Sequence, residues 1–227
     1  MINTEPMTEH EKSEWERIEA QQESRQNIIG QNGNNGDHYG KREPVYLDTE
    51  TTGLFVSEGA ELLEIAIVTE SGEVLMDSFV KPYHATEWPE AMLINQITPE
   101  TVAGAPYFHE IANQIKDTLT GRTVVIWNAP FDLQFLSGLA DKSNVICAMR
   151  EYGDFIERTQ PHNISHNGRY KLEYTANDLG VEIEGQPHRA LTDVLTTIYV
   201  RQAWKSGQHD QADLSGSVNV PPYQTAD

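Results

Sequence analysis

Hydrophobic and polar positions divide the chain into three zones, and only the central zone has the apolar content of a folded domain. Residues 1–43 and 206–227 are mostly polar. Residues 44–205 alternate short apolar runs with segments of helical periodicity. We therefore predict one globular domain over 44–205, a polar N-terminal extension with a flexible linker over 1–43, and a disordered tail over 206–227.

Four short runs in the central zone have the character of β-strands. Residues 45–48 are apolar and end in acidic residues. Residues 61–68 and 73–80 are joined by a Ser-Gly dipeptide, which is typical of a hairpin turn. Residues 123–127 are continuously apolar, which indicates a buried strand.

Helical signals mark six further segments of this zone. They are 89–95, 108–119, a helix from Pro130, a helix from about Ala148, 172–179, and a last helix from about His188 to Lys205. Gly180 follows the fifth segment and supplies a residue that commonly ends a helix. Strands followed by alternating strands and helices predict an α/β domain with a mixed sheet.

Acidic residues stand where two of the predicted strands end. Asp48 and Glu50 are two residues apart in the first strand, so both side chains can point to one face of the sheet. Asp132 follows the strand 123–127, and Asp193 lies in the last helix, shortly after His188. Ligand sites of α/β proteins lie at the carboxyl ends of strands. Each acid taken alone is also compatible with an ordinary solvated position.

The residues around these acids form three motifs. Residues 44–54 read PVYLDTETTGL, residues 124–133 read VVIWNAPFDL, and residues 187–197 read PHRALTDVLTT. Over roughly residues 44–203, they resemble in order and spacing the three motifs of the DEDDh (DnaQ-like) 3′-to-5′ exonuclease family. This family includes polymerase proofreading subunits, exonuclease X, RNase T and oligoribonucleases. The resemblance implies an RNase H-like fold, an α/β fold with a mixed five-stranded sheet flanked by helices.

The same resemblance implies roles for the motif residues. Asp48, Glu50, Asp132 and Asp193 would hold two Mg²⁺ or Mn²⁺ ions, and His188 would be the general base. Phosphodiester hydrolysis needs charge neutralised around the scissile phosphate, and hard divalent cations bound by carboxylates provide this. Imidazole side chains accept protons near neutral pH. A histidine at a helix start can also lack any chemical task, but the surrounding motif favours catalysis.

Five further residues match substrate-contacting positions of the family. Thr51 and Leu54 would contact the terminal nucleotide, with Leu54 wedged against its base. Glu90 would accept a hydrogen bond from the 3′ hydroxyl, and Phe131 would stack on a base. Asn95 replaces the histidine usual in the family, so it can donate to a phosphate or base but carries no charge. Leu54 and Phe131 have an alternative role as packing residues.

The charge of the chain limits how it can bind nucleic acid. With 35 acidic and 16 basic residues, the formal net charge is −19, the wrong sign for tight binding through counterion release. Acids that bind metal ions offset this only locally, so we expect weak, salt-sensitive binding restricted to strand ends.

These observations predict an exonuclease that releases nucleoside 5′-monophosphates from the 3′ ends of single-stranded or frayed DNA. An exoribonuclease that acts on short RNA, as oligoribonuclease and RNase T do, is the main alternative. A non-catalytic nucleic-acid-binding module is a third possibility. Loss of one of the motif acids would have favoured this module, and all four are present.

Both polar ends contain a candidate binding segment for a replication protein or another partner. Thr8 and Glu11 form a capping box that predicts a helix over 8–26, whose Trp15 and Ile18 would anchor in a groove of the partner. Residues 211–215 (QADLS) resemble the bacterial sliding-clamp-binding pentapeptide, with a serine at an apolar position of that motif. A solvated tail is the alternative.

The sequence also predicts a location for the protein. A transmembrane run and an N-terminal secretory signal are both missing from it. Cys147 is the single cysteine and has no partner for an intrachain disulfide. We therefore expect a cytoplasmic protein that does not bind membranes.

Overall fold

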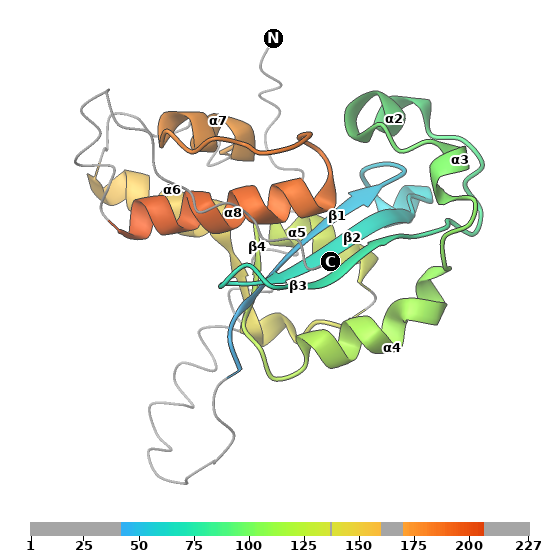
Figure 1. The fold of residues 1–227 in the computed structure, drawn as a ribbon, viewed down its shortest axis with the longest axis horizontal. Helices are drawn as coiled ribbons and strands as arrows, with labels where there is room; N and C mark the ends of the chain where they lie inside the picture. The colour runs from blue at the N-terminus through green and yellow to red at the C-terminus, as the bar shows by residue number, and fades with distance from the viewer. Residues whose placement is uncertain (1–41, 137, 160–169, 207–227) are drawn as a thin grey trace, which may run out of the picture.

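The structure is a computed structural model that describes residues 42–136, 138–159 and 170–206. One mixed β-sheet forms its centre and helices cover both faces of the sheet (Figure 1). The helix predicted over 8–26 and the pentapeptide at 211–215 lie outside the described residues.

Five strands form the sheet in the order β3-β2-β1-β4-β5. They are β1 (Val45–Thr51), β2 (Leu62–Thr69), β3 (Val74–Phe79), β4 (Val124–Ile126) and β5 (Val145–Cys147). β2 pairs antiparallel with β1 and β3, whereas β1, β4 and β5 run parallel. The mixed five-stranded sheet implied by the resemblance is therefore confirmed. β5 was not predicted from the hydrophobic pattern, because it runs directly into the next helix and its apolar side chains resemble the start of that helix.

Seven α-helices and two short 3₁₀ helices are seen in the described residues. The α-helices are α2 (Pro89–Asn95), α3 (Pro99–Val102), α4 (Phe108–Leu119), α5 (Ala129–Phe135), α6 (Ala148–Thr159), α7 (Leu172–Asp178) and α8 (Ala190–Lys205), and the 3₁₀ helices are η1 (Val56–Glu58) and η2 (Lys142–Asn144). The predicted helices over 89–95 and 108–119 are confirmed. Within the described segments, none of the helices is long and apolar enough to cross a membrane.

Two apolar layers lie on the two faces of the sheet. Val45 and Leu47 belong to the layer that also contains buried residues of α4 and α5. Tyr46 points the other way, into a layer with buried residues of α6 and α8. Because side chains alternate along a strand, Asp48 and Glu50 share the direction of Tyr46 and point toward the α8 side.

The last helix begins later than predicted. α8 starts at Ala190, and His188 has a left-handed backbone with φ of 60°. The backbone N–H of Ala190 donates to the buried carboxylate of Glu64 on β2 (3.0 Å). This long-range contact fixes the start of α8 and leaves His188 in the turn before it, so the helix predicted from about His188 is present but begins two residues later.

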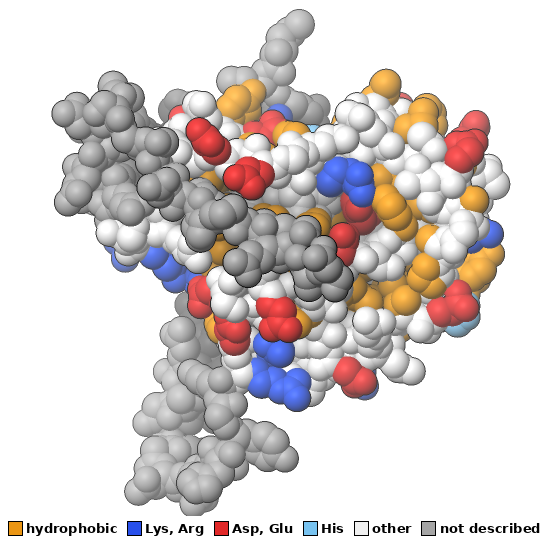
Figure 2. Space-filling view, in the orientation of Figure 1, with side chains coloured by type: hydrophobic (Ala, Val, Ile, Leu, Met, Phe, Trp, Pro, Cys, Tyr) orange, Lys and Arg blue, Asp and Glu red, His pale blue; other side chains and the backbone are white. Residues whose placement is uncertain are grey.

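The surface over α2 and α3 is rich in apolar side chains (Figure 2). Leu93 and Ile94 on α2 are 82% and 56% exposed, and Leu54 after β1 is 66% exposed. Large apolar side chains gathered on a surface mark places where a ligand or partner can bind.

Candidate active site

Two half-buried acids, Asp48 and Glu50, lie on the central strand β1. In the antiparallel pairing with β2, Ala66 lies opposite Asp48 and Glu64 lies opposite Glu50. The register shifts directly after Glu50, where the strand approaches its end. α8 packs across both β1 and β2 on this face, so the two acids lie beneath its N-terminal end.

Two further acids reach the same place from different helices. Asp132 lies in the first turn of α5, is 2% exposed, and accepts a hydrogen bond from Thr49 Oγ1 at 2.7 Å. Asp193 lies in the first turn of α8, where its Oδ1 accepts from the backbone N–H of His188 at 3.3 Å. The fold thus brings carboxylates from β1, α5 and α8 into mutual electrostatic range.

Burial and repulsion from neighbouring acids raise the pKa of all four carboxyl groups. Loss of hydration is the largest cause in each case. The pKa of Asp48 is well above its ordinary value, with further contributions from Asp132, Asp193 and Glu50. The pKa is raised to about 8 for Glu50, about 7 for Asp132 and about 6 for Asp193. Four such groups are stable as carboxylates only when positive charge is close by.

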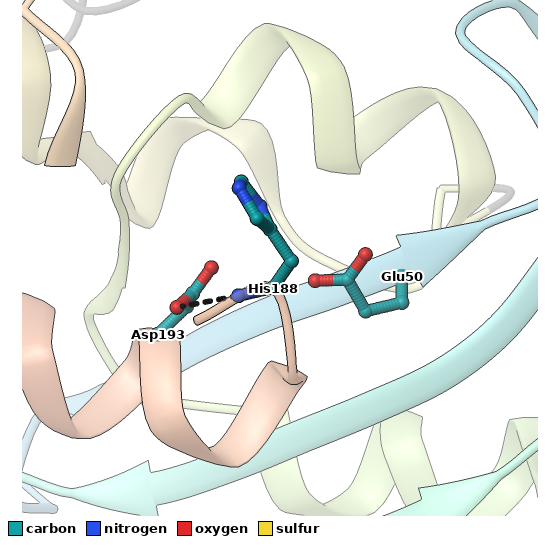
Figure 3. Close-up of side chains that lie close together, drawn as sticks. All are labelled: Glu50, His188 and Asp193. Atoms are coloured by element: carbon teal, nitrogen blue, oxygen red, sulfur yellow. Dashed lines mark hydrogen bonds between the residues drawn. The ribbon is translucent and has the colours of Figure 1, made fainter. Parts of the chain in front are cut away.

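Figure 3 shows Glu50 and Asp193 beside His188, which comes from the turn before α8. One potential ligand atom from each of these three residues lies within 4.8 Å of the others. The imidazole Nε2 of His188 also contacts Glu173 Oε1 on α7 at 3.1 Å. His188 is exposed, so it stands at the rim of the acidic cluster with its ring partnered by Glu173.

A buried ion pair that the motifs did not point to lies next to this cluster. Glu64 is 2% exposed and accepts hydrogen bonds from Arg189 Nε (3.0 and 3.2 Å) and Nη2 (2.5 Å). The guanidinium also lies over the ring of Phe79, 5.0 Å from its centroid. The signal in the sequence was a glutamate inside an apolar strand, because a buried charge requires a partner.

We expect Arg189→Ala to destabilise the protein, because it leaves the buried Glu64 carboxylate without its charged partner. The cost should be about 2–3 kcal/mol, at the low end for a buried pair because the Arg189 side chain is one-third exposed. Urea unfolding followed by circular dichroism measures it. The double variant Glu64→Gln/Arg189→Ala should recover part of the loss, and an unchanged single variant would contradict this prediction.

Three of the five predicted substrate residues are at least partly accessible to solvent. Leu54 follows β1 and is 66% exposed, while Glu90 is exposed in the first turn of α2. Phe131 is half-buried, and its ring centroid lies 5.4 Å from that of Phe135. Thr51 is buried and donates through Oγ1 to Gly53 O at 2.7 Å, so its hydroxyl fixes the turn after β1.

Asn95, the fifth predicted substrate residue, is buried at the end of α2. It is 2% exposed, its Nδ2 donates to Thr51 O (3.2 Å), and its Oδ1 accepts from Ile97 N (3.0 Å). Both ends of the amide are therefore used inside the protein. Through these contacts Asn95 ties the end of α2 to the end of β1, and its predicted donation to a phosphate or base stays a prediction.

Comparisons with known proteins agree with this geometry. A family model described as Exonuclease matches residues 45–201. An uncharacterized exonuclease of Escherichia phage 186 is 31% identical over 72% of this chain and 88% of its own length. The DNA polymerase III subunit epsilon of Rickettsia typhi is 31% identical over 69% of this chain and 72% of its own length.

Solved structures show the same fold. Exonuclease X in complex with 5′ overhanging duplex DNA has a TM-score of 0.52 and 25% identity over 72% of this chain and 92% of its own. The nuclease domain of 3'hExo, a DEDDh family member bound to rAMP, has a TM-score of 0.56 and 16% identity over 77% of this chain and 96% of its own. Fold and relatives together define a nuclease with an RNase H-like architecture. The chain belongs to the DnaQ-like 3′-to-5′ exonuclease family.

Proposed function

We propose that this protein is a metal-dependent exonuclease that releases nucleoside 5′-monophosphates from the 3′ ends of single-stranded or frayed DNA. The convergence of Asp48, Glu50, Asp132 and Asp193 from three separate segments supports it most directly. Burial and repulsion raise the pKa of each of these groups, so the fold keeps them together at a cost in stability. Such a cost is typical of functional sites.

The donor set fits two Mg²⁺ or Mn²⁺ ions. All four groups offer carboxylate oxygen, the ligand that hard divalent cations prefer. Asp48, Glu50, Asp132 and Asp193 would hold the ions. When bound, such a pair neutralises charge on the scissile phosphate and lowers the pKa of the attacking water.

The remaining residues would act on water and on the substrate. His188 would accept the proton of the attacking water, and Glu173, 3.1 Å from its Nε2, would orient the ring. Glu90 would accept a hydrogen bond from the 3′ hydroxyl, and the exposed Leu54 would contact the terminal base. Phe131 would border the same base.

DNA is the favoured substrate because the relatives at about 30% identity include DNA polymerase III epsilon subunits, and because exonuclease X is similar in fold and was solved with DNA. Preference for RNA would depend on how the site treats the terminal 2′ hydroxyl.

The test uses single-stranded DNA and RNA of one sequence, labelled at either the 5′ or the 3′ end, with Mg²⁺, Mn²⁺ or EDTA. We expect a metal-dependent ladder that shortens from the 3′ end, with faster cleavage of DNA. Faster cleavage of RNA than of DNA would instead identify the protein as an exoribonuclease. If folded protein that binds metal cleaves neither polymer, the proposed exonuclease activity is refuted and a binding module is favoured.

A further inference from the structure

Aromatic and cationic side chains gather at a second place, outside the acidic cluster. The rings of Tyr83 and Tyr107 stack with centroids 4.6 Å apart, and Lys81 Nζ lies 5.3 Å from the centroid of Tyr107. His109 hydrogen-bonds the Tyr83 hydroxyl through Nδ1, and the ring of His84 lies 6.1 Å from that of Tyr83. We call these five residues the aromatic platform.

The backbone under the platform is held in place by one carboxylate. Glu61 accepts from the backbone N–H groups of Tyr83 (2.6 Å), His84 (2.8 Å) and Ala85 (2.7 Å). The negative charge of Glu61 is therefore used by backbone donors. Tyr83 is nevertheless 54% exposed, and His84 is exposed as well, so a rigid backbone presents aromatic surface to solvent.

Two connections link the platform to the segments that carry the acidic cluster. Thr52, two residues after Glu50, exchanges hydrogen bonds with Glu61, from Thr52 N to Glu61 O (2.8 Å) and from Glu61 N to Thr52 Oγ1 (2.9 Å). Glu61 in turn holds the backbone of the platform.

The second connection runs along β3. Phe79 lies under the guanidinium of Arg189, the neighbour of His188, and Lys81 follows Phe79 by two residues. Both connections lead from the end of the sheet that holds the acids, where α2 and α3 also lie (Figure 1).

We propose that the aromatic platform binds the single strand on the 5′ side of the nucleotide being removed. A base would stack on Tyr83, and Lys81 would contact a backbone phosphate. This inference rests on the proposed exonuclease function and deepens it. It also fits the charge of −19, because stacking on an aromatic ring needs few cations and accepts every base.

The experiment compares KM for a dinucleotide, which occupies only the acidic site, with KM for an oligonucleotide of about ten nucleotides. In the wild type, KM should be lower for the longer substrate. Tyr83→Ala should raise the ratio of the long-substrate KM to the dinucleotide KM by about tenfold, since stacking of one base contributes on this order. Lys81→Gln should change the ratio in the same direction, by about threefold, and more at low salt.

Two variants make the result specific. Tyr83→Phe loses the hydrogen bond to His109 but keeps the ring. The ratio of the long-substrate KM to the dinucleotide KM should therefore stay close to the wild-type value. Lys116→Gln removes an exposed positive charge on α4 outside the platform and should leave the ratio at the wild-type value. An unchanged ratio in Tyr83→Ala, or an equal rise of KM for both substrates, would overturn the proposal.

If the wild type cleaves neither substrate, the exonuclease proposal fails and the platform is tested by binding alone. Fluorescence anisotropy with a labelled single-stranded oligonucleotide then measures Kd. Weaker binding by Tyr83→Ala than by Tyr83→Phe supports the platform, and equal binding overturns it.

Discussion

Replacing Asp48 by Asn is expected to abolish most nuclease activity while making the metal-free protein more stable. In the proposed mechanism, loss of one carboxylate weakens binding of the metal ions that would neutralise charge at the scissile phosphate, an effect worth several kcal/mol that corresponds to about a thousandfold in kcat. The same change removes a group whose pKa is raised by burial and by its acidic neighbours. The Tm in EDTA at pH 8 should therefore rise by about 5 °C.

The two measurements are initial rates on labelled single-stranded DNA and thermal unfolding in EDTA. Asp117→Asn is the matched control, because Asp117 is exposed on α4, outside the cluster. It should change neither quantity. A lower Tm for Asp48→Asn in EDTA would contradict the view that repulsion among the acids destabilises the metal-free fold.

The second large effect is the dependence of stability on pH and metal. Folding raises the pKa of Glu50 to about 8, of Asp132 to about 7 and of Asp193 to about 6. A carboxyl group whose pKa is raised by folding stabilises the fold fully below its unfolded pKa, near 4, and this stability is lost as pH rises through the folded pKa. From pH 5.5 to 8.5, Tm in EDTA should fall by roughly 10 °C.

Divalent metal should reverse this loss, because it binds the ionised form of the cluster in the folded state. Differential scanning fluorimetry with and without Mg²⁺ or Mn²⁺ measures the effect at each pH. The increase in Tm on adding metal should be larger at pH 8 than at pH 5.5. A metal-free Tm that stays constant over this range would show that folding does not raise the pKa of these acids.

Most of the fold could be predicted from the sequence, because most strands, helices and turns are indicated by residues that are close together in the chain. The hairpin between β2 and β3 was predicted from a Ser-Gly turn, and Gly72 does adopt a positive φ of 95°. The hydrophobic pattern did not indicate β5. β5 has three residues and runs directly into α6, so its apolar side chains resemble the start of that helix.

Contacts between distant segments explain what could not be predicted at the site. The start of α8 depends on Glu64, which is 125 residues away from Arg189 in sequence. The motif likewise gave no indication that the Asn95 amide donates to the backbone of Thr51, 44 residues away. The motifs therefore identified which acids to consider, whereas the partners that hold them in place needed the structure.

The position of α8 has a consequence for synthesis of the protein. β1 and α5, which carry three of the four acids, precede α8 in the chain, but only α8 supplies Asp193 and closes the face over Asp48 and Glu50. A growing chain that has not yet released α8 from the ribosome lacks a complete cluster. The nuclease should thus stay latent until α8 has left the ribosome, so that nearby nucleic acid is spared until the domain has folded.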